Sequence, residues 1–210
     1  MTPQQTALIE HVLTTLMDHY GPQHWWEHAN RLEDWVSMIL VQQTTGTNAE
    51  KAIANLQPYM TVAQLRQMPI EQLQTLIRPA GFYRSKSEYV KILLDWYADH
   101  GADLAAFKDV STADLRRQLL ALKGVGEETA DDMLLYIFHR PVFIADTYAR
   151  RLFHRLGWGP YKTYHQMWQA FQPVAEQQSF ETCREWHAVI DEHGKAYRRD
   201  EVLDESWLVD

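Results

Sequence analysis

Apolar residues recur every three or four positions along most of the chain, which places them on one face of an α-helix. The segment 34–41 shows this spacing with Trp35, Ile39 and Val41. Alternation of apolar and polar residues is never long enough for a half-buried strand, and the apolar run 142–144 is too short to count as one. The pattern predicts an all-α protein. The predicted helices cover residues 3–20, 34–41, 48–56, 61–68, 70–78, 85–98, 112–121, 127–139, 146–156, 163–177 and 180–197.

Side chains that can cap a helix stand before several of these segments. Asn48 is the predicted N-cap of the third helix, and Thr61 and Ser111 precede later helices in the same way. Gly21 followed by Pro22 is predicted to end the first helix. We therefore expect short helices that are joined by tight turns.

The composition narrows the class of protein. At 210 residues the chain can form one large core or two small lobes that share a cleft, and 46% hydrophobic residues are ordinary for a folded protein. Eight Trp and ten Tyr can either fill a core or stack on a flat ligand. The net charge of −8 argues against a protein that coats nucleic acid by bulk electrostatics, so any nucleic-acid contact must use local basic patches.

The single cysteine, Cys183, excludes a disulfide framework and a four-thiolate zinc or iron–sulfur site within one chain. The first residues lack the basic and apolar regions of a signal peptide, and no run of about 18 apolar residues indicates a membrane span. The histidines near the N-terminus lack the spacing of a metal site, so no metal bound by side chains is expected. We expect a cytoplasmic protein, nucleoid-associated if bacterial, without a membrane partner.

The stretch LKGVGEETADDML, residues 122–134, places two glycines in a turn between two predicted helices. Without a Cβ atom, Gly124 and Gly126 let the backbone approach anything that lies against the turn. The amides of Gly124, Val125 and Gly126 are predicted to form a nest that binds a phosphate. Carbonyl groups near Leu122 and Val125 could hold a cation beside that phosphate. The alternative is a tight corner between helices that needs glycine only for its geometry.

The stretch HRPVFIADTYARRLFHRLG, residues 139–157, is basic although the whole chain is acidic. We expect Arg150, Arg151 and Arg155 on one side of its helix and apolar residues such as Leu152 on the other. This arrangement is typical of a helix that docks on a core and presents a basic outer face. That face could contact nucleic acid or simply be solvated.

These two stretches, in this order, resemble the helix-hairpin-helix DNA glycosylase superfamily, which includes endonuclease III, adenine glycosylase and the 3-methyladenine glycosylases. The segments ILVQQTTGTNAEKAIANL, LIRPAGFYRSKSEYVKIL and WHAVIDEHGKAYR resemble further parts of that family, so the likeness covers roughly residues 20–197. Within the superfamily the chain is most similar to endonuclease III-related proteins and 3-methyladenine glycosylase III.

The resemblance implies two helical lobes with a DNA-binding helix-hairpin-helix at the cleft between them. Residues 1–28 and 140–210 would form one lobe. Residues 29–139 would form the other, with the helix-hairpin-helix at about 112–139. The implied partner is double-stranded DNA with a damaged base flipped out of the duplex, bound by a monomer.

The resemblance also implies hydrolysis of the bond between a base and its deoxyribose. Asp146 matches the family's catalytic aspartate, and its place at a helix N-terminus favours the ionised form; alternatively, it only caps that helix. Bifunctional members carry a lysine where this chain has Glu128, and a carboxylate cannot form an imine with the sugar. We therefore expect a monofunctional glycosylase in which Asp146 positions water and Glu128 could help to orient it.

Roles in binding DNA and the damaged base follow from the same resemblance. Gln42 would fill the gap left by the flipped nucleotide. Trp25 and Trp26 resemble aromatic residues that stack on an alkylated purine, although either could instead fill the core. The expected substrate is therefore an alkylated purine. The residues expected to bind the DNA backbone are Lys123, Gly124, Val125, Gly126, Arg150 and Arg151.

The family's iron–sulfur loop follows the last helix and needs four cysteines. The corresponding region AYRRDEVLDESWLVD has none, so we expect no cluster, and no cofactor other than a monovalent cation in the hairpin. The tail around Trp207 would either pack or stay loose. Two alternatives stay open: an abasic-site lyase that uses another amine, and a catalytically inactive protein that binds damaged DNA. The charge of −8 and Glu128 favour the second of these.

Overall fold

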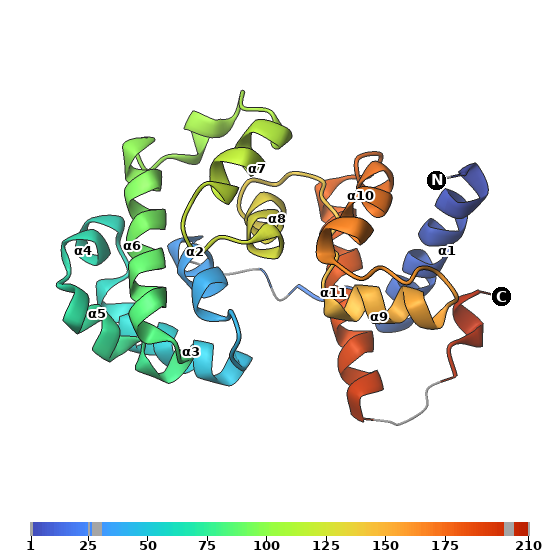
Figure 1. Ribbon diagram of the computed structural model, residues 1–210, viewed down its shortest axis with the longest axis horizontal. Helices are drawn as coiled ribbons and strands as arrows, with labels where there is room; N and C mark the ends of the chain where they lie inside the picture. The colour runs from blue at the N-terminus through green and yellow to red at the C-terminus, as the bar shows by residue number, and fades with distance from the viewer. Residues whose placement is uncertain (1, 25, 27–30, 200–203, 210) are drawn as a thin grey trace. The chain divides into compact units, whose positions relative to one another are not determined.

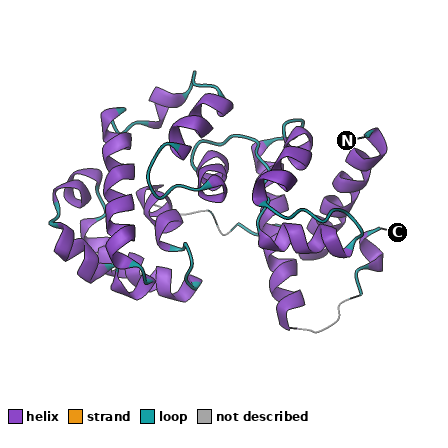
Figure 2. Ribbon diagram, viewed as in Figure 1, coloured by secondary structure: helices purple, strands orange, loops and turns teal. Residues whose placement is uncertain are grey.

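The computed structural model describes residues 2–24, 26, 31–199 and 204–209, and in these residues the regular structure is helical, without a strand (Figure 2). The all-α prediction is confirmed. None of the helices in these ranges is long and apolar enough to cross a lipid bilayer.

Contacts between Cα atoms divide the chain into two compact units (Figure 1). The first unit holds Met1–Trp26 and His139–Asp210, and the second holds Glu27–Phe138. The helices of the first unit are α1 (Pro3–Tyr20), α9 (Thr147–Arg155), α10 (Tyr164–Ala175), α11 (Phe180–Arg199) and the 3₁₀-helix η4 (Ser206–Leu208). The second unit has α2 (Arg31–Leu40), α3 (Gly46–Leu56), α4 (Val62–Gln67), α5 (Ile70–Leu76), α6 (Tyr83–Asp99), α7 (Thr112–Leu120) and α8 (Glu127–Tyr136), with 3₁₀-helices η1 (Gln57–Tyr59), η2 (Arg78–Ala80) and η3 (Leu104–Phe107).

Helix α11 packs against both α1 and α9 in the first unit. Val12, Leu13 and Leu16 of α1 are fully buried. On the side of α9, a Cβ atom added to Gly194 would lie 2.3 Å from Cδ1 of Tyr148. Glycine at position 194 therefore lets the Tyr148 ring lie directly on the backbone of α11.

A polar network joins the C-terminal segment to three helices of the first unit. Arg155 donates hydrogen bonds from Nε and Nη2 to the Glu205 carboxylate, at 2.8 and 2.5 Å. The same carboxylate lies 2.8 Å from Nε2 of His193, whose Nδ1 lies 2.9 Å from the Tyr20 hydroxyl. The centroid of the Trp207 ring lies 6.2 Å from that of His193. The tail around Trp207 is therefore packed.

The basic face of α9 is smaller than predicted. The guanidinium of Arg155 is engaged by Glu205 and lies 3.5 Å from the centroid of the Tyr197 ring. The prediction that Arg155 belongs to a basic outer face is therefore wrong. Helical periodicity could not reveal this, because the carboxylate that binds Arg155 lies 50 residues further along the chain.

Aromatic rings fill much of the core of the second unit. The ring of Trp35 in α2 stacks on Tyr97 in α6, with 4.8 Å between their centroids. Trp96 packs on Phe107 at 5.0 Å, and Phe138 meets Trp35 edge-on at 5.4 Å. Part of the high aromatic content therefore serves packing.

Capping side chains identify some helix starts correctly. Thr61 and Ser111 cap α4 and α7 as predicted, because each hydroxyl oxygen accepts a hydrogen bond from the amide three residues later, at 3.2 and 3.1 Å. The prediction that Asn48 caps the third helix is wrong. Thr45 is the N-cap, its hydroxyl accepts from the amide of Asn48 at 3.3 Å, and α3 begins at Gly46.

We predict that Glu205→Gln destabilises the protein at neutral pH. Burial alone would raise the pKa of Glu205, but the hydrogen bonds from Arg155 and His193 outweigh it and lower the pKa. At pH 7 the variant leaves the Arg155 guanidinium without its carboxylate, so the free energy of unfolding should fall by about 3 kcal/mol in urea denaturation. Asp18→Asn, at an exposed position of α1, is the control.

The effect of Glu205→Gln should depend on pH with a defined sign. Because the folded-state pKa lies below the unfolded value of about 4.3, the ionised carboxylate stabilises the fold above that pH. This stabilisation is lost as the pH falls through the folded-state pKa, so the wild type and variant should converge in acid. An equal difference between them at pH 7 and in acid would contradict this account.

Candidate functional site

The turn between α7 and α8 requires glycine at position 124. Gly124 has φ +93°, and a Cβ atom there would lie 2.1 Å from Cγ of Tyr89 in α6. Gly126 is different, because its φ is −90° and a Cβ atom would meet open space. The glycine at 124 is therefore explained by packing and backbone conformation, whereas Gly126 only precedes the first turn of α8.

One amide of the predicted anion-binding nest makes a hydrogen bond inside the turn. The amide of Val125 donates a hydrogen bond to the carbonyl of Leu122 at 3.1 Å, and the Val125 side chain is buried. The Val125 amide is therefore engaged within the turn, and its contact with a phosphate stays a prediction. The same bond occupies one lone pair of the Leu122 carbonyl, which was expected to face a cation. The other amides that could bind a phosphate belong to Gly124, Gly126 and the first turn of α8.

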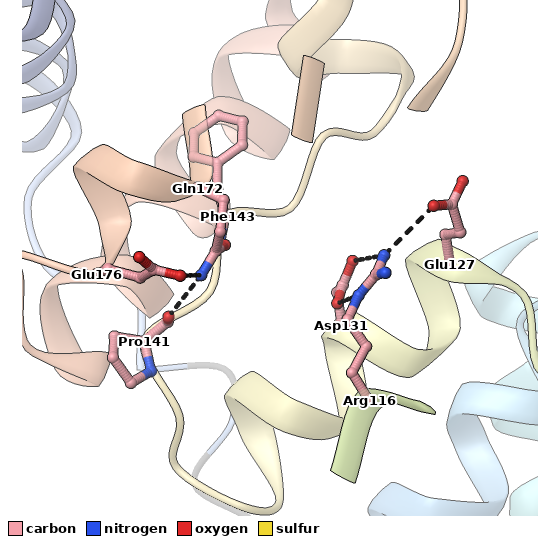
Figure 3. Close-up of polar contacts among 7 residues, drawn as sticks. All are labelled: Arg116, Glu127, Asp131, Pro141, Phe143, Gln172 and Glu176. Atoms are coloured by element: carbon pink, nitrogen blue, oxygen red, sulfur yellow. Dashed lines mark hydrogen bonds and ion pairs between the residues drawn. The ribbon is translucent and has the colours of Figure 1, made fainter. Parts of the chain in front are cut away.

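A buried ion pair holds α7 and α8 together (Figure 3). Arg116 donates from Nε to Oδ1 of Asp131 at 2.7 Å and from Nη2 to Oδ2 at 3.0 Å. Its Nη2 also lies 3.4 Å from Oε1 of Glu127, and the Asp131 side chain is fully buried. Burial alone would lower the pKa of Arg116, but the hydrogen bonds and charges of Asp131 and Glu127 raise it. Glu127 therefore has a structural role in the hairpin.

Helix α6 also contacts the surface of the turn. Nζ of Lys123 lies 2.9 Å from Oε2 of Glu88, and both side chains are more than half exposed. The hydrogen bond and the negative charge of Glu88 raise the pKa of Lys123. Because water reaches both groups, this pair is weak, and Lys123 can exchange its partner for another anion.

Gln42 is held against the hairpin. Its Nε2 donates to the carbonyl of Gly124 and to the hydroxyl of Thr129, both at 3.0 Å, so both amide hydrogens are used. The next residue, Gln43, is exposed and has φ +51°. The sequence analysis selected Gln42 and missed Gln43, although two adjacent glutamines made both residues candidates for the same role. Insertion of Gln42 into DNA would require both bonds to break, whereas Gln43 already points to solvent.

A second exposed loop precedes α6, and sequence reasoning missed it. Phe82 is 65% exposed and adopts φ +43°, a left-handed conformation that is costly for a bulky residue. The guanidinium groups of Arg78 and Arg84 lie 5.6 and 5.9 Å from the centroid of the Tyr83 ring. Within the described residues neither arginine has an acidic partner. The exposed Phe82 ring thus lies next in the chain to Tyr83, a ring flanked by two exposed cations, and such a combination is typical of a surface that contacts nucleic acid.

Asp146 lies at the start of α9 in the first unit. Its Oδ1 accepts a hydrogen bond from the amide of Ala149 at 2.7 Å, so Asp146 is the N-cap. The chain enters this position through the buried apolar segment 142–145. Gln172 fixes that segment, because its Oε1 accepts from the amide of Phe143 at 2.9 Å and its Nε2 donates to the carbonyl of Pro141 at 3.2 Å (Figure 3). The carboxylate is thus half-buried and held in one place.

The side chains of the two remaining arginines of α9 differ in their exposure and hydrogen bonding. Arg150 is half-buried, with Nη2 3.2 Å from the hydroxyl oxygen of Thr147 and Nη1 3.4 Å from the carbonyl of Lys162. Arg151 is exposed. Arg150 therefore helps to shape the start of α9, and Arg151 is the cation that this helix presents to solvent.

The other residues singled out from the sequence fall in different places. Glu128 is exposed in the first turn of α8. Trp25 lies outside the described residues, and Trp26 is half-buried with the Arg184 guanidinium 4.8 Å from its ring centroid.

No cluster of His, Cys, Asp or Glu in the described parts of the chain could hold a metal ion. Burial raises the pKa of the Cys183 thiol to about 12.

Gly124→Ala should destabilise the hairpin far more than Gly126→Ala. The first change forces a left-handed alanine into the Tyr89 ring, whereas the second adds a methyl group in open space. We expect a loss of about 2–4 kcal/mol in the free energy of unfolding for Gly124→Ala, by strain and overpacking. For Gly126→Ala we expect a loss of about 1 kcal/mol or less. Thermal or urea denaturation measures both, and equal losses would contradict the described packing.

The chain matches known proteins at the level of sequence. The family described as "HhH-GPD superfamily base excision DNA repair protein" matches residues 36–177. A relative from Methanocaldococcus jannaschii, named "Putative DNA repair glycosylase MJ1434", is 35% identical over 208 residues, which are 97% of this chain and 94% of the relative. Endonuclease III from Thermotoga maritima is 34% identical over 128 residues, which are 59% of this chain and 55% of that protein.

The chain is also similar to solved structures. The 3-methyladenine DNA glycosylase MagIII of H. pylori, bound to 1,N6-ethenoadenine, matches with a TM-score of 0.72 and 21% identity, covering 94% of this chain and 98% of that one. A trapped endonuclease III–DNA covalent intermediate matches with a TM-score of 0.69 and 24% identity, covering 89% and 85%. At these identities the likeness concerns the fold.

Proposed function

Because the chain belongs to the HhH-GPD superfamily of base excision DNA repair proteins, we propose that it is a monofunctional DNA glycosylase. It would hydrolyse the bond between a damaged base and its deoxyribose and leave an abasic strand. The observation that carries this proposal is the Asp146 carboxylate at the N-terminus of α9, together with a carboxylate rather than an amine at position 128.

Asp146 is suited to stabilise positive charge on the sugar. Loss of a base produces an oxocarbenium-like transition state, and a carboxylate near the sugar is favourable there. The amide of Ala149 and the positive end of the α9 dipole keep the carboxylate ionised. The hydrogen bond from the Ala149 amide to Oδ1 also fixes the direction in which the carboxylate points.

The absence of an amine at position 128 argues against lyase chemistry. A bifunctional enzyme needs a neutral amine that attacks the sugar and forms an imine. The carboxylate of Glu128 cannot do this, and the nearest hairpin amine, Lys123, has its pKa raised by Glu88 and so stays protonated. Water is therefore the proposed nucleophile, and Glu128 is a candidate for orienting it.

Contacts with the DNA backbone would use the hairpin and a few exposed cations. The amides of Gly124 and Gly126 and the ammonium of Lys123 are proposed to bind one phosphate, with Arg151 binding another. A monovalent cation held by the hairpin carbonyls could face the same phosphate. The net charge of −8 makes these local cations necessary.

Base extrusion would use two of the exposed residues that have a left-handed backbone, Gln43 and Phe82. Phe82 is proposed to act as an apolar wedge between bases, while Arg78 and Arg84 neutralise the flanking phosphates. Gln43, rather than Gln42, is proposed to fill the gap that the flipped nucleotide leaves. Gln42 would instead keep the loop on the hairpin.

The proposed substrate is an alkylated purine. Such a base is often cationic and leaves readily, so stacking on aromatic rings can select it without strong acid catalysis. Trp26 and Trp25 are the proposed aromatic residues, and the bound 1,N6-ethenoadenine of MagIII, a modified purine, supports this class.

Asp146→Asn should strongly slow catalysis without disturbing the fold, because asparagine caps helices as well as aspartate does. We expect wild type to release a methylated purine from methylated duplex DNA, detected by chromatography. The single-turnover rate of the variant should fall by about 10²–10³-fold. Thermal denaturation of both proteins serves as the control for folding.

Two outcomes of this experiment would contradict the proposal. Strand cleavage with an adduct that borohydride traps would identify an abasic-site lyase. Tight binding of damaged duplexes without release of any base would identify a catalytically inactive binding protein. Release of a base other than a purine would overturn the substrate class but leave the glycosylase assignment intact.

Phe82→Ala should weaken binding to a duplex that contains an abasic site. Loss of one aromatic contact with bases is worth about 1–3 kcal/mol, so the dissociation constant should rise by about ten- to hundredfold. The side chain is 65% exposed, so stability should not fall. Val209→Ala, at a position exposed to 44% in the tail, is the apolar control in a fluorescence anisotropy titration. Equal effects of the two substitutions would contradict the wedge.

A further inference from the structure

Lys86 is a buried cation whose ammonium group joins two segments of the second unit. Its side chain is only 2% exposed, and Nζ donates to the carbonyls of Leu40 and Ala80, both at 2.8 Å. Leu40 is the last residue of α2, and Ala80 is the last residue of η2. The two carbonyls therefore lie within two hydrogen-bond lengths of each other.

Each of these carbonyls stands directly before one of the exposed loops. Gln43 follows Leu40 by three residues, and Phe82 follows Ala80 by two. Both residues have positive φ angles and are exposed. Only two or three residues separate Phe82 and Gln43 from the carbonyls that Lys86 binds. The ammonium group therefore fixes the positions from which both exposed loops start.

The electrostatics of Lys86 favour this arrangement over an ordinary ion pair. No acidic side chain of the described residues pairs with it, and its charge is balanced by carbonyl dipoles, one of them at the C-terminus of α2. Burial lowers the pKa of Lys86. A buried cation that is held only by backbone carbonyls is stable only while both hydrogen bonds are kept, so Lys86 resists separation of the two carbonyls.

We propose that Lys86 is a positioning residue that couples the loop 41–45 to the loop 81–82, so that Gln43 and Phe82 enter a duplex together. This inference rests on the proposed function, because it concerns how a damaged base is extruded. With the ammonium in place, displacement of one loop displaces the other. Without it, each loop moves alone and the two insertions lose their cooperation.

Lys91 offers a matched comparison on the same helix. Its Nζ donates to the carbonyls of Leu65, Arg66 and Met68 at 2.6, 2.7 and 2.5 Å, and so caps the end of α4. Burial lowers the pKa of Lys91 as well. Like Lys86, Lys91 binds only backbone carbonyls, but these carbonyls do not lead to either exposed loop. Substitution of Lys91 therefore measures the general effect of losing such a lysine, and any additional effect in Lys86 variants is specific to base extrusion.

The test compares Lys86→Met with Lys91→Met. A duplex carrying 2-aminopurine beside a tetrahydrofuran abasic-site analogue reports unstacking by fluorescence and does not require base release. We expect Lys86→Met to bind undamaged duplex as the wild type does. Its fluorescence rise should be reduced but still measurable, and its single-turnover base release should slow by about tenfold or more. Lys91→Met should match the wild type in all three measurements.

Coupling itself is measured by combining loop substitutions. In the wild type, Gln43→Ala and Phe82→Ala together should reduce unstacking less than the product of their separate effects, because the first loss already disables the second loop. In Lys86→Met the two effects should multiply independently. If Lys86→Met does not fold, Lys86→Gln, which keeps one donor amide, is measured in its place, with an intermediate loss expected.

Failure of this inference and failure of the proposed function give different results. Equal behaviour of Lys86→Met and Lys91→Met, or unchanged cooperation between the loops in Lys86→Met, would overturn the coupling. Parallel losses of undamaged-duplex binding and unstacking in Lys86→Met would also overturn it, since they indicate a general defect. If the wild type unstacks the duplex but releases no base, and unstacking is reduced in Lys86→Met but not in Lys91→Met, the glycosylase would be overturned and the coupling supported.

Discussion

The packing of the Tyr89 ring against Gly124 is the contact on which the hairpin depends. It leaves no space for a Cβ atom, so the turn can adopt its left-handed conformation only with glycine. The Gly124 carbonyl is then placed to accept from Gln42, which ties the loop after α2 to the hairpin. The ion pair between Arg116 and Asp131 holds the two hairpin helices in the matching position.

Helix α6 organises the same end of the second unit. Along its length it places Phe82 at its start, Lys86 under two loops, and Tyr89 against the hairpin turn. Polar groups that would be costly to bury alone are satisfied here by backbone carbonyls rather than by acidic side chains. A rigid helix with short loops can thus present strained, exposed residues without losing the fold around them.

The sequence predicted the helices well, because helical periodicity and capping are local properties. Thr61 and Ser111 were assigned correctly, whereas Asn48 was not, because Thr45 could cap the same segment three residues earlier. Arg155 was misassigned because its partner, Glu205, is distant in the chain. Gln43 and Phe82 were not selected from the sequence, because no local sequence pattern predicts a positive φ angle in a residue other than glycine. The roles of Asp146 and Glu128 stay predictions, since fold alone does not establish chemistry.

Disulfide cross-linking tests most directly whether this end of the second unit engages the lesion. Cys183 is buried, and its raised pKa of about 12 keeps it out of the reaction, so single cysteines can be placed at will. Phe82→Cys and Gln43→Cys should cross-link rapidly to a thiol tethered at the abasic-site analogue. Asp109→Cys should not, because it lies beyond the other end of α6, a helix about 25 Å long. Equal cross-linking at all three positions would contradict the account.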